Sequence, residues 1–144
     1  MPLVTIETRR WMTAEQKARA FDAVHGALVA AFKIPDADRH QRLVEYEAEN
    51  FEIPPGKGER YTVVAIDAFA GRSLDAKRML YREIVDRLAA VEIPPADVLI
   101  LLREAAPENW GVRGGQAACD VDLGFQIRVV SRGEADLVAL NLVE

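Results

Sequence analysis

Ile34-Pro-Asp-Ala-Asp38 recurs further along the chain as Ile93-Pro-Pro-Ala-Asp97, and this repetition decides the fold. Two more pairs of segments match at nearly the same offset: Ile6-Glu7 with Ile66-Asp67, and Glu49-Asn50-Phe51 with Glu108-Asn109-Trp110. The offset stays near sixty residues. A fixed period of this length indicates an internal duplication of one supersecondary unit.

The first unit has the pattern of a strand, a helix and a second strand. Leu3 to Thr8 alternates apolar and polar residues, as half-buried strands do. Thr13 is a predicted helix N-cap, and Gln16 is spaced from it as in a capping box. The helix is expected to end near Lys33, before Pro35. Leu43 and Val44 indicate a short second strand.

The second unit repeats this order. Tyr61 to Phe69 is an apolar strand, Ser73 is the expected N-cap of a second helix, and Val98 to Leu102 is another apolar strand. A right-handed crossover through each helix would make the two strands of a unit parallel.

These units predict an α+β fold with two layers, in which a four-stranded mixed sheet carries both helices on one face. The segments 62–66 and 98–102 are apolar on both sides, so the other face also needs a cover. We expect other copies of the chain to supply it. We expect one domain over residues 1–144, with repeats over about 2–51 and 61–110 and a C-terminal strand and tail over about 121–144.

The composition excludes several classes of partner. The 144 residues carry a net charge of −5 and are 50% hydrophobic, which is typical of a soluble globular chain. Without a basic surplus or a basic amphipathic segment, we expect no nucleic-acid and no membrane partner. Cys119 is the only cysteine, and neither a signal segment nor metal-ligand spacing is evident. We expect a cytoplasmic protein that requires no metal or cofactor.

The chain begins Met1-Pro2-Leu3, with a proline directly behind the initiator methionine. If Met1 is removed, the Pro2 nitrogen becomes a secondary amine that can accept or donate a proton. A free α-amine has a reference pKa near about 8, and burial lowers that pKa because the charged form is disfavoured. Such an amine can act as a general base near neutral pH. The alternative is an ordinary proline before a strand, where the missing N–H does no harm.

Several short motifs, in the same order and on the same predicted elements, resemble the tautomerase superfamily. They are Pro2 behind Met1, Ala37-Asp38-Arg39-His40-Gln41, Ala70-Gly71-Arg72-Ser73 and Glu108-Asn109-Trp110-Gly111. The resemblance covers about residues 2 to 127 and is nearest to the branch that contains malonate semialdehyde decarboxylase. It implies a β-α-β-β-α-β fold of the tautomerase/MIF type, a homotrimer of duplicated chains, and the N-terminal proline as the catalytic group.

The resemblance also assigns Arg72 and Asp38 to the site of Pro2. Arg72 lies before the N-cap of the second helix, where a guanidinium can hold a substrate carboxylate through two hydrogen bonds; the alternative is a solvated loop arginine. The decarboxylase branch has a second arginine where this chain has Ala70, which bears on substrate binding. Asp38 matches the catalytic aspartate of the branch. Because Asp97 stands at the same place in the second repeat, Asp38 is either a catalytic carboxylate or a turn residue.

Further side chains are candidates for the substrate pocket. His25 is predicted either to bind substrate, as in a related cis-3-haloacrylate dehalogenase, or to be a core histidine. Trp110 and Phe125 are expected to wall the pocket, with core or interface packing as the alternative. Arg113 is expected to be an exposed loop cation, with replacement of the missing arginine as the alternative. His40 is expected to be exposed.

We therefore expect a cofactor-independent tautomerase that interconverts the enol and keto forms of a small 2-oxo acid. Arg72 would hold the substrate carboxylate, and a neutral Pro2 would move a proton between the enol oxygen and carbon 3. The first alternative is a malonate semialdehyde decarboxylase or hydratase, in which Pro2 stays cationic and Asp38 helps to place water. The second is a non-catalytic oligomeric binding protein that kept the fold.

Overall fold

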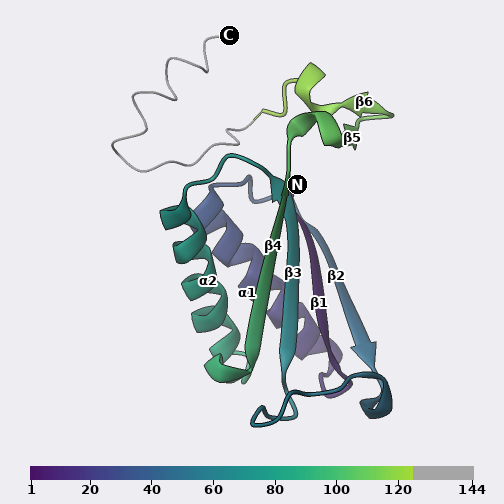
Figure 1. The fold of residues 1–144 in the computed structure, drawn as a ribbon, viewed down its shortest axis with the longest axis vertical. Helices are drawn as coiled ribbons and strands as arrows, with labels where there is room; N and C mark the ends of the chain where they lie inside the picture. Colours follow the sequence, from purple (N-terminus) through teal and green to yellow (C-terminus); the bar gives the residue numbers. More distant parts are fainter. Residues whose placement is uncertain (125–144) are drawn as a thin grey trace.

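Two β-α-β units follow one another in the computed structural model, which describes residues 1–124 (Figure 1). In chain order the elements are β1 (Leu3–Arg9), α1 (Ala14–Phe32), β2 (His40–Tyr46), η1 (Ala48–Asn50), β3 (Thr62–Phe69), α2 (Leu74–Ala89), η2 (Pro95–Asp97), β4 (Val98–Ala105), η3 (Pro107–Asn109), β5 (Gly111–Val112), β6 (Gln116–Ala117) and η4 (Ala118–Asp120). Residues 121–124 are not in a strand, in contrast to the expectation for this segment. The rest of the predicted C-terminal strand and tail, Phe125 included, lies outside the described residues.

The main sheet has the strand order β2-β1-β3-β4. Strands are parallel within each unit and antiparallel where β1 meets β3. The central register is symmetric, because Leu3 pairs with Asp67 and Glu7 pairs with Val63. An offset of about sixty residues exchanges these two pairs, so the units are related by a pseudo-two-fold axis. The predicted α+β fold with a mixed four-stranded sheet is confirmed.

Both helices lie on the same face of the sheet (Figure 1), and each begins at its predicted cap. Thr13 and Gln16 form the capping box, in which each side chain accepts a hydrogen bond from the backbone N–H of the other. Lys33 ends α1 in a left-handed conformation, with φ 56°. The Ser73 hydroxyl accepts from the N–H of Ala76 at the start of α2. Within the described residues, neither helix has the length and apolar character needed to cross a membrane.

The hydrophobic core lies between the helices and the sheet. Its largest fully buried side chains are Phe32, Phe69, Ile6, Leu28, Ile66, Leu80, Ile84, Leu88, Ile93, Val4, Val24 and Val64. Burying a side chain of this size stabilises the fold by about 1.5–3 kcal/mol before the entropy of ordering is counted.

Among residues 1–124, no segment covers the opposite face of the sheet. Leu99 and Leu101 of β4 are about half exposed, and Val44 of β2 is also exposed. Strands β2 and β4 are the two edges of this sheet, so each presents one row of backbone groups without a strand partner in it. This is the apolar face for which the sequence indicates a cover.

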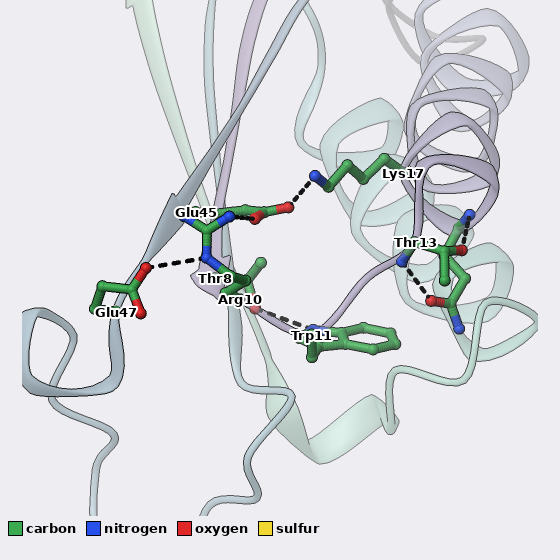
Figure 2. A network of polar contacts seen from close by, with 8 residues as sticks. Thr8, Arg10, Trp11, Thr13, Lys17, Glu45 and Glu47 are labelled. Atoms are coloured by element: carbon green, nitrogen blue, oxygen red, sulfur yellow. Dashed lines mark hydrogen bonds and ion pairs between the residues drawn. The ribbon is translucent and has the colours of Figure 1, made fainter.

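A polar network secures the end of the sheet at which β1 leads into α1 (Figure 2). The nearly buried Glu45 carboxylate lies 3.2 Å from Arg10 Nη1 and also pairs with Lys17. Arg10 Nε donates to Glu47 Oε1 at 3.0 Å. These contacts join β2 to the β1–α1 turn, at the end opposite to the one at which the chain begins (Figure 1).

Candidate active site

The start of β1, the loop before β2 and the start of α2 meet at one end of the sheet (Figure 1). The parallel register places Leu3 of β1 opposite His40 of β2. Because side chains on a strand alternate with period two, the residues two positions earlier, Met1 and Asp38, fall on the same side as this pair. The terminal amine and a carboxylate are thus brought together by the register of the sheet.

Asp38 links the terminal amine to an imidazole. Its Oδ2 contacts the Met1 amine, and its Oδ1 lies 3.1 Å from His40 Nε2. The Asp38 side chain is only 13% exposed. Its backbone N–H donates to the carbonyl of Pro35 at 3.0 Å, so the residue also closes a turn. Asp38 therefore both lies in a turn and contacts the terminal amine, and a catalytic role for it stays a prediction.

A cavity of about 520 Å³ opens beside the chain start, large enough for a small ligand. The described residues that line it are Met1, Pro35, Ala37, Asp38, His40, Gly111, Val112, Arg113 and Leu123. Pro2 is buried one residue behind Met1, and with Met1 in place its nitrogen is an amide. The Met1 side chain packs against a small cluster formed by Phe69, Val112 and Ala118.

Arg72 is buried, with 6% of its surface exposed, and it is not among the described residues that line this cavity. Nη1 donates to the Phe69 carbonyl at 3.1 Å, and the guanidinium lies 4.8 Å from the centre of the Phe32 ring. Nε and Nη2 have no hydrogen-bond partner among residues 1–124. Desolvation lowers the pKa of Arg72 to about 10, while the carboxylates of Glu104 and Asp38 oppose this shift. The guanidinium therefore stays charged at neutral pH, and two of its buried nitrogens have no hydrogen-bond partner within the described part of the chain.

Trp110 packs against the Phe69 cluster and is not among the described residues that line the cavity. Its ring centroid is 4.8 Å from that of Phe69, and its indole N–H donates to the Ala105 carbonyl at 3.2 Å. Val112 belongs both to the Phe69 cluster and to the cavity wall. Phe125, the other predicted wall residue, lies outside the described residues.

His25 is buried away from the cavity lining. It is 4% exposed, and its Nε2 has no hydrogen-bond partner among the described residues, although Asp36 Oδ1 lies 3.4 Å away. Asp36 stands in the same loop as Asp38. This placement fits the expectation of a core histidine better than that of a substrate ligand.

Two residues of the site were not favoured by the sequence reasoning. His40 is 51% exposed, as expected, but it also contacts Asp38 and lines the cavity. Arg113, at φ 48° between β5 and β6, is exposed and lines the same cavity. Because side chains two positions apart in an extended segment point to the same side, the place of His40 two residues after Asp38 could have indicated that they are neighbours. The hairpin that positions Arg113 had no sequence signal beyond Gly114 and Gly115.

Known proteins share this fold. Two family models described as tautomerase enzymes match residues 38–113 and residues 2–56. The solved structure of FG41 malonate semialdehyde decarboxylase inhibited by 3-bromopropiolate is 28% identical, with a TM-score of 0.74 over 80% of this chain and 92% of that chain.

Two further structures support the fold. A malonate semialdehyde decarboxylase, solved in wild-type, mutant and inactivated forms, is 24% identical, with a TM-score of 0.76 over 83% of this chain and 99% of that chain. A fused 4-OT solved as a symmetric trimer is 24% identical, with a TM-score of 0.74 over 81% of this chain and 96% of that chain.

Fold and site together define a class of α+β proteins built from two β-α-β units, with the N-terminus at one end of an inner strand of the sheet. The first family model covers more than half of the chain. The chain belongs to the tautomerase family, as its motifs predicted, and malonate semialdehyde decarboxylases are among its structural relatives.

Proposed function

We propose that the chain, once Met1 is removed, is a cofactor-independent enzyme that uses the Pro2 amine for proton transfer to or from a small oxo-carboxylate. The observation that carries this proposal is the contact between the terminal amine and the shielded Asp38 carboxylate, with the buried Arg72 cation in electrostatic range. Excision of Met1 would transfer the free amine to Pro2. It would also empty the space that the Met1 side chain fills against the Phe69 cluster.

Asp38 favours an acidic role for the amine. An opposite charge within roughly 4–6 Å stabilises the charged form of an ionisable group. Asp38 contacts the amine of Met1, the residue bonded to Pro2, so its carboxylate lies near the Pro2 nitrogen. The reaction supported best is therefore decarboxylation or hydration of a short 3-oxo acid such as malonate semialdehyde, the substrate named for the 28% identical relative.

In the decarboxylation, the cationic Pro2 amine would donate its proton to the carbonyl oxygen of the substrate. The carbon–carbon bond to the carboxylate would break and release CO2. Its electron pair would form the double bond of an enol, which returns to the aldehyde when its carbon is protonated and its hydroxyl proton is released. Arg72, two of whose nitrogens have no partner among residues 1–124, would orient the substrate.

Arg72 also favours the second candidate, tautomerisation of a small 2-oxo acid. A nearby buried cation disfavours a second positive charge and would leave Pro2 neutral, as a general base. Arg72 would hold the carboxylate, and Pro2 would move a proton between the enol oxygen and carbon 3. The two candidates differ in the charge of one amine.

The decisive assay compares wild type with Pro2→Ala on malonate semialdehyde and on phenylenolpyruvate, after mass spectrometry has verified the loss of Met1. We expect Pro2→Ala to lose activity by at least about 100-fold, the scale of general acid–base catalysis. Pro54→Ala, in an exposed loop, is the matched control. Rates at the uncatalysed level for both wild type and Pro2→Ala would leave a non-catalytic binding protein, and equal rates above that level would show that Pro2 is not the catalytic group. A titration midpoint of the Pro2 amine near about 9 supports the acid, and one near about 6–7 supports the base.

We also propose that three copies assemble through the uncovered face of the sheet. The exposed Leu99 and Leu101 support this, as does the trimeric state of the fused 4-OT relative. Light scattering should give three times the 16.0 kDa mass of the chain, and Leu99→Lys should lower it. A wild-type monomer would contradict the proposal.

A further inference from the structure

His40 makes a contact that the proposed mechanism does not use. Its Nε2 lies 3.1 Å from Asp38 Oδ1, while Oδ2 of the same carboxylate contacts the terminal amine of Met1. Three groups that can bind a proton therefore stand in a row: an amine, a carboxylate and an imidazole. The strand register fixes this row, because His40 is the first residue of β2 and pairs with Leu3.

The two ends of the row differ in their access to water. The Asp38 side chain is shielded, whereas the His40 side chain is half exposed, and both line the cavity. Charges interact more strongly where water is partly excluded. A change of charge on the imidazole therefore acts on the carboxylate, and through it on the amine.

We propose that His40 is a positioning residue that sets how firmly Asp38 holds the proton on the Pro2 amine. This inference rests on the proposed function of Pro2. A neutral His40 leaves the full negative charge of Asp38 to the amine. A protonated His40 shares that charge, so the amine releases its proton more readily. His40 thus couples the proton state of the reacting amine to the pH of the solvent.

The other cations near His40 do not change charge near neutral pH. Arg39 and Arg42 share a second hollow with His40, and Arg113 shares the main cavity. Arginine stays protonated throughout the neutral range, whereas histidine is the side chain that ordinarily titrates between about pH 5 and 8. Among the cationic side chains around Asp38, the imidazole is therefore the group that can respond to pH.

The test measures kcat and KM on malonate semialdehyde from about pH 5 to 9 for the full chain without Met1. We expect His40→Gln to lower kcat by about tenfold at the acid end of this range, where a protonated imidazole would share the Asp38 charge, because one unit of coupling changes a proton equilibrium tenfold. At the alkaline end the variant should match wild type, and KM should stay within about twofold throughout. Its pH profile should lose one ionisation. Arg42→Gln, which changes a neighbour on the same strand, is the matched control and should keep the wild-type profile.

A second readout does not depend on turnover. The chain has two histidines, so NMR can follow each imidazole separately. Asp38→Asn should move the signals of His40 and leave those of His25 unchanged. Urea unfolding of each variant verifies that it is folded.

The outcomes separate the two proposals. Wild-type kcat and an unchanged pH profile in His40→Gln, with Pro2→Ala inactive, would overturn the role of His40 and leave the proposed function intact. Full activity of Pro2→Ala would overturn both. Unmoved His40 signals in Asp38→Asn would also reject the coupling.

Discussion

The two β-α-β units place equivalent residues at opposite ends of the sheet. The backbone is similar at the two ends, but equivalent side chains have different surroundings. Asp38 of the first unit corresponds to Asp97 of the second. Asp38 contacts the terminal amine beside a cavity. Asp97 is buried and accepts the backbone N–H of Gly58 at 3.1 Å. The same side chain faces a cavity at one end and anchors a loop at the other.

The residues before the two helix caps differ in the same way. Arg72 precedes the N-cap Ser73, and Met12 precedes the N-cap Thr13; both are buried. Methionine completes an apolar core, whereas an incompletely paired guanidinium costs stability. A protein retains such a cost where the charge has a use, and this difference directs the first prediction.

The largest expected effect comes from Arg72→Met, which puts methionine before the N-cap of both helices. We expect kcat/KM to fall by about 100-fold or more, because charge-assisted hydrogen bonds contribute about 1.5–3 kcal/mol each. The fold should keep or gain stability in urea, since the substitution removes two buried nitrogens that have no partner among the residues the structure describes. The pKa of Arg72 is lowered, so the unfolded chain binds its proton more tightly. This group therefore makes wild-type stability rise with pH above about 10, and the variant should lack that rise.

Arg78→Met is the control for this prediction, because Arg78 lies on the exposed side of α2 and pairs with Asp75 there. It should leave activity unchanged. Retained activity in Arg72→Met would mean that the buried cation serves the fold alone.

Replacing the two aspartates separately should give opposite results. Asp38→Ala should lower kcat by about 100-fold with little change in stability, which is the scale of general acid–base effects. Asp97→Ala should leave activity unchanged and reduce the free energy of unfolding by about 1–2 kcal/mol, because the Gly58 N–H loses its acceptor. Rate measurements and urea titrations test both. Similar phenotypes would show that the two ends are not specialised.

The smallest expected effect concerns a third equivalent pair, Glu7 and Asp67. Glu7 accepts from the Tyr46 hydroxyl at 3.0 Å, whereas Asp67 binds Arg103 through two bonds of 2.8 and 3.0 Å. The bond from Arg103 lowers the pKa of Asp67, so its contribution is present above the usual aspartate pKa and is lost as pH falls through the folded value. A double-mutant cycle of Asp67→Ala and Arg103→Ala should give a small coupling in urea.

The pH dependence of this coupling is the check. It should be larger at pH 7 than at a pH below the lowered pKa of Asp67, where the carboxyl is protonated in both the folded and the unfolded state. Coupling that grows in acid would contradict the assignment. A large coupling at neutral pH would indicate that another copy covers this face, because exposed pairs contribute little.

The sequence predicted the elements that local chemistry determines. The caps Thr13 and Ser73 and the crossovers come from residue types at fixed spacing, and the structure confirms them. Strand β2 is longer than the expected Leu43–Val44, because it pairs with β1 over its whole length although His40, Gln41, Arg42 and Glu45 are polar. The extra length comes from hydrogen bonding to β1, which the local sequence pattern of β2 cannot predict.

The candidate site was predicted in part for the same reason. The resemblance of short motifs named Asp38 and Arg72. The contact of His40 with Asp38 depends instead on the register between two strands. His25 lies on the inward stripe of α1 and faces the core rather than the cavity lining. Periodicity gives the face of a helix, but not which part of that face meets the cavity.

The packing of Met1 against the Phe69 cluster has a practical consequence for anyone who purifies this protein. An affinity tag fused ahead of the first residue would preserve the peptide bond at Pro2 and crowd the hollow beside it. If Pro2 acts as we propose, such a preparation would show no turnover even when it is folded. On our proposal, a purification handle belongs at the other terminus, and an inactive tagged sample says nothing about the enzyme.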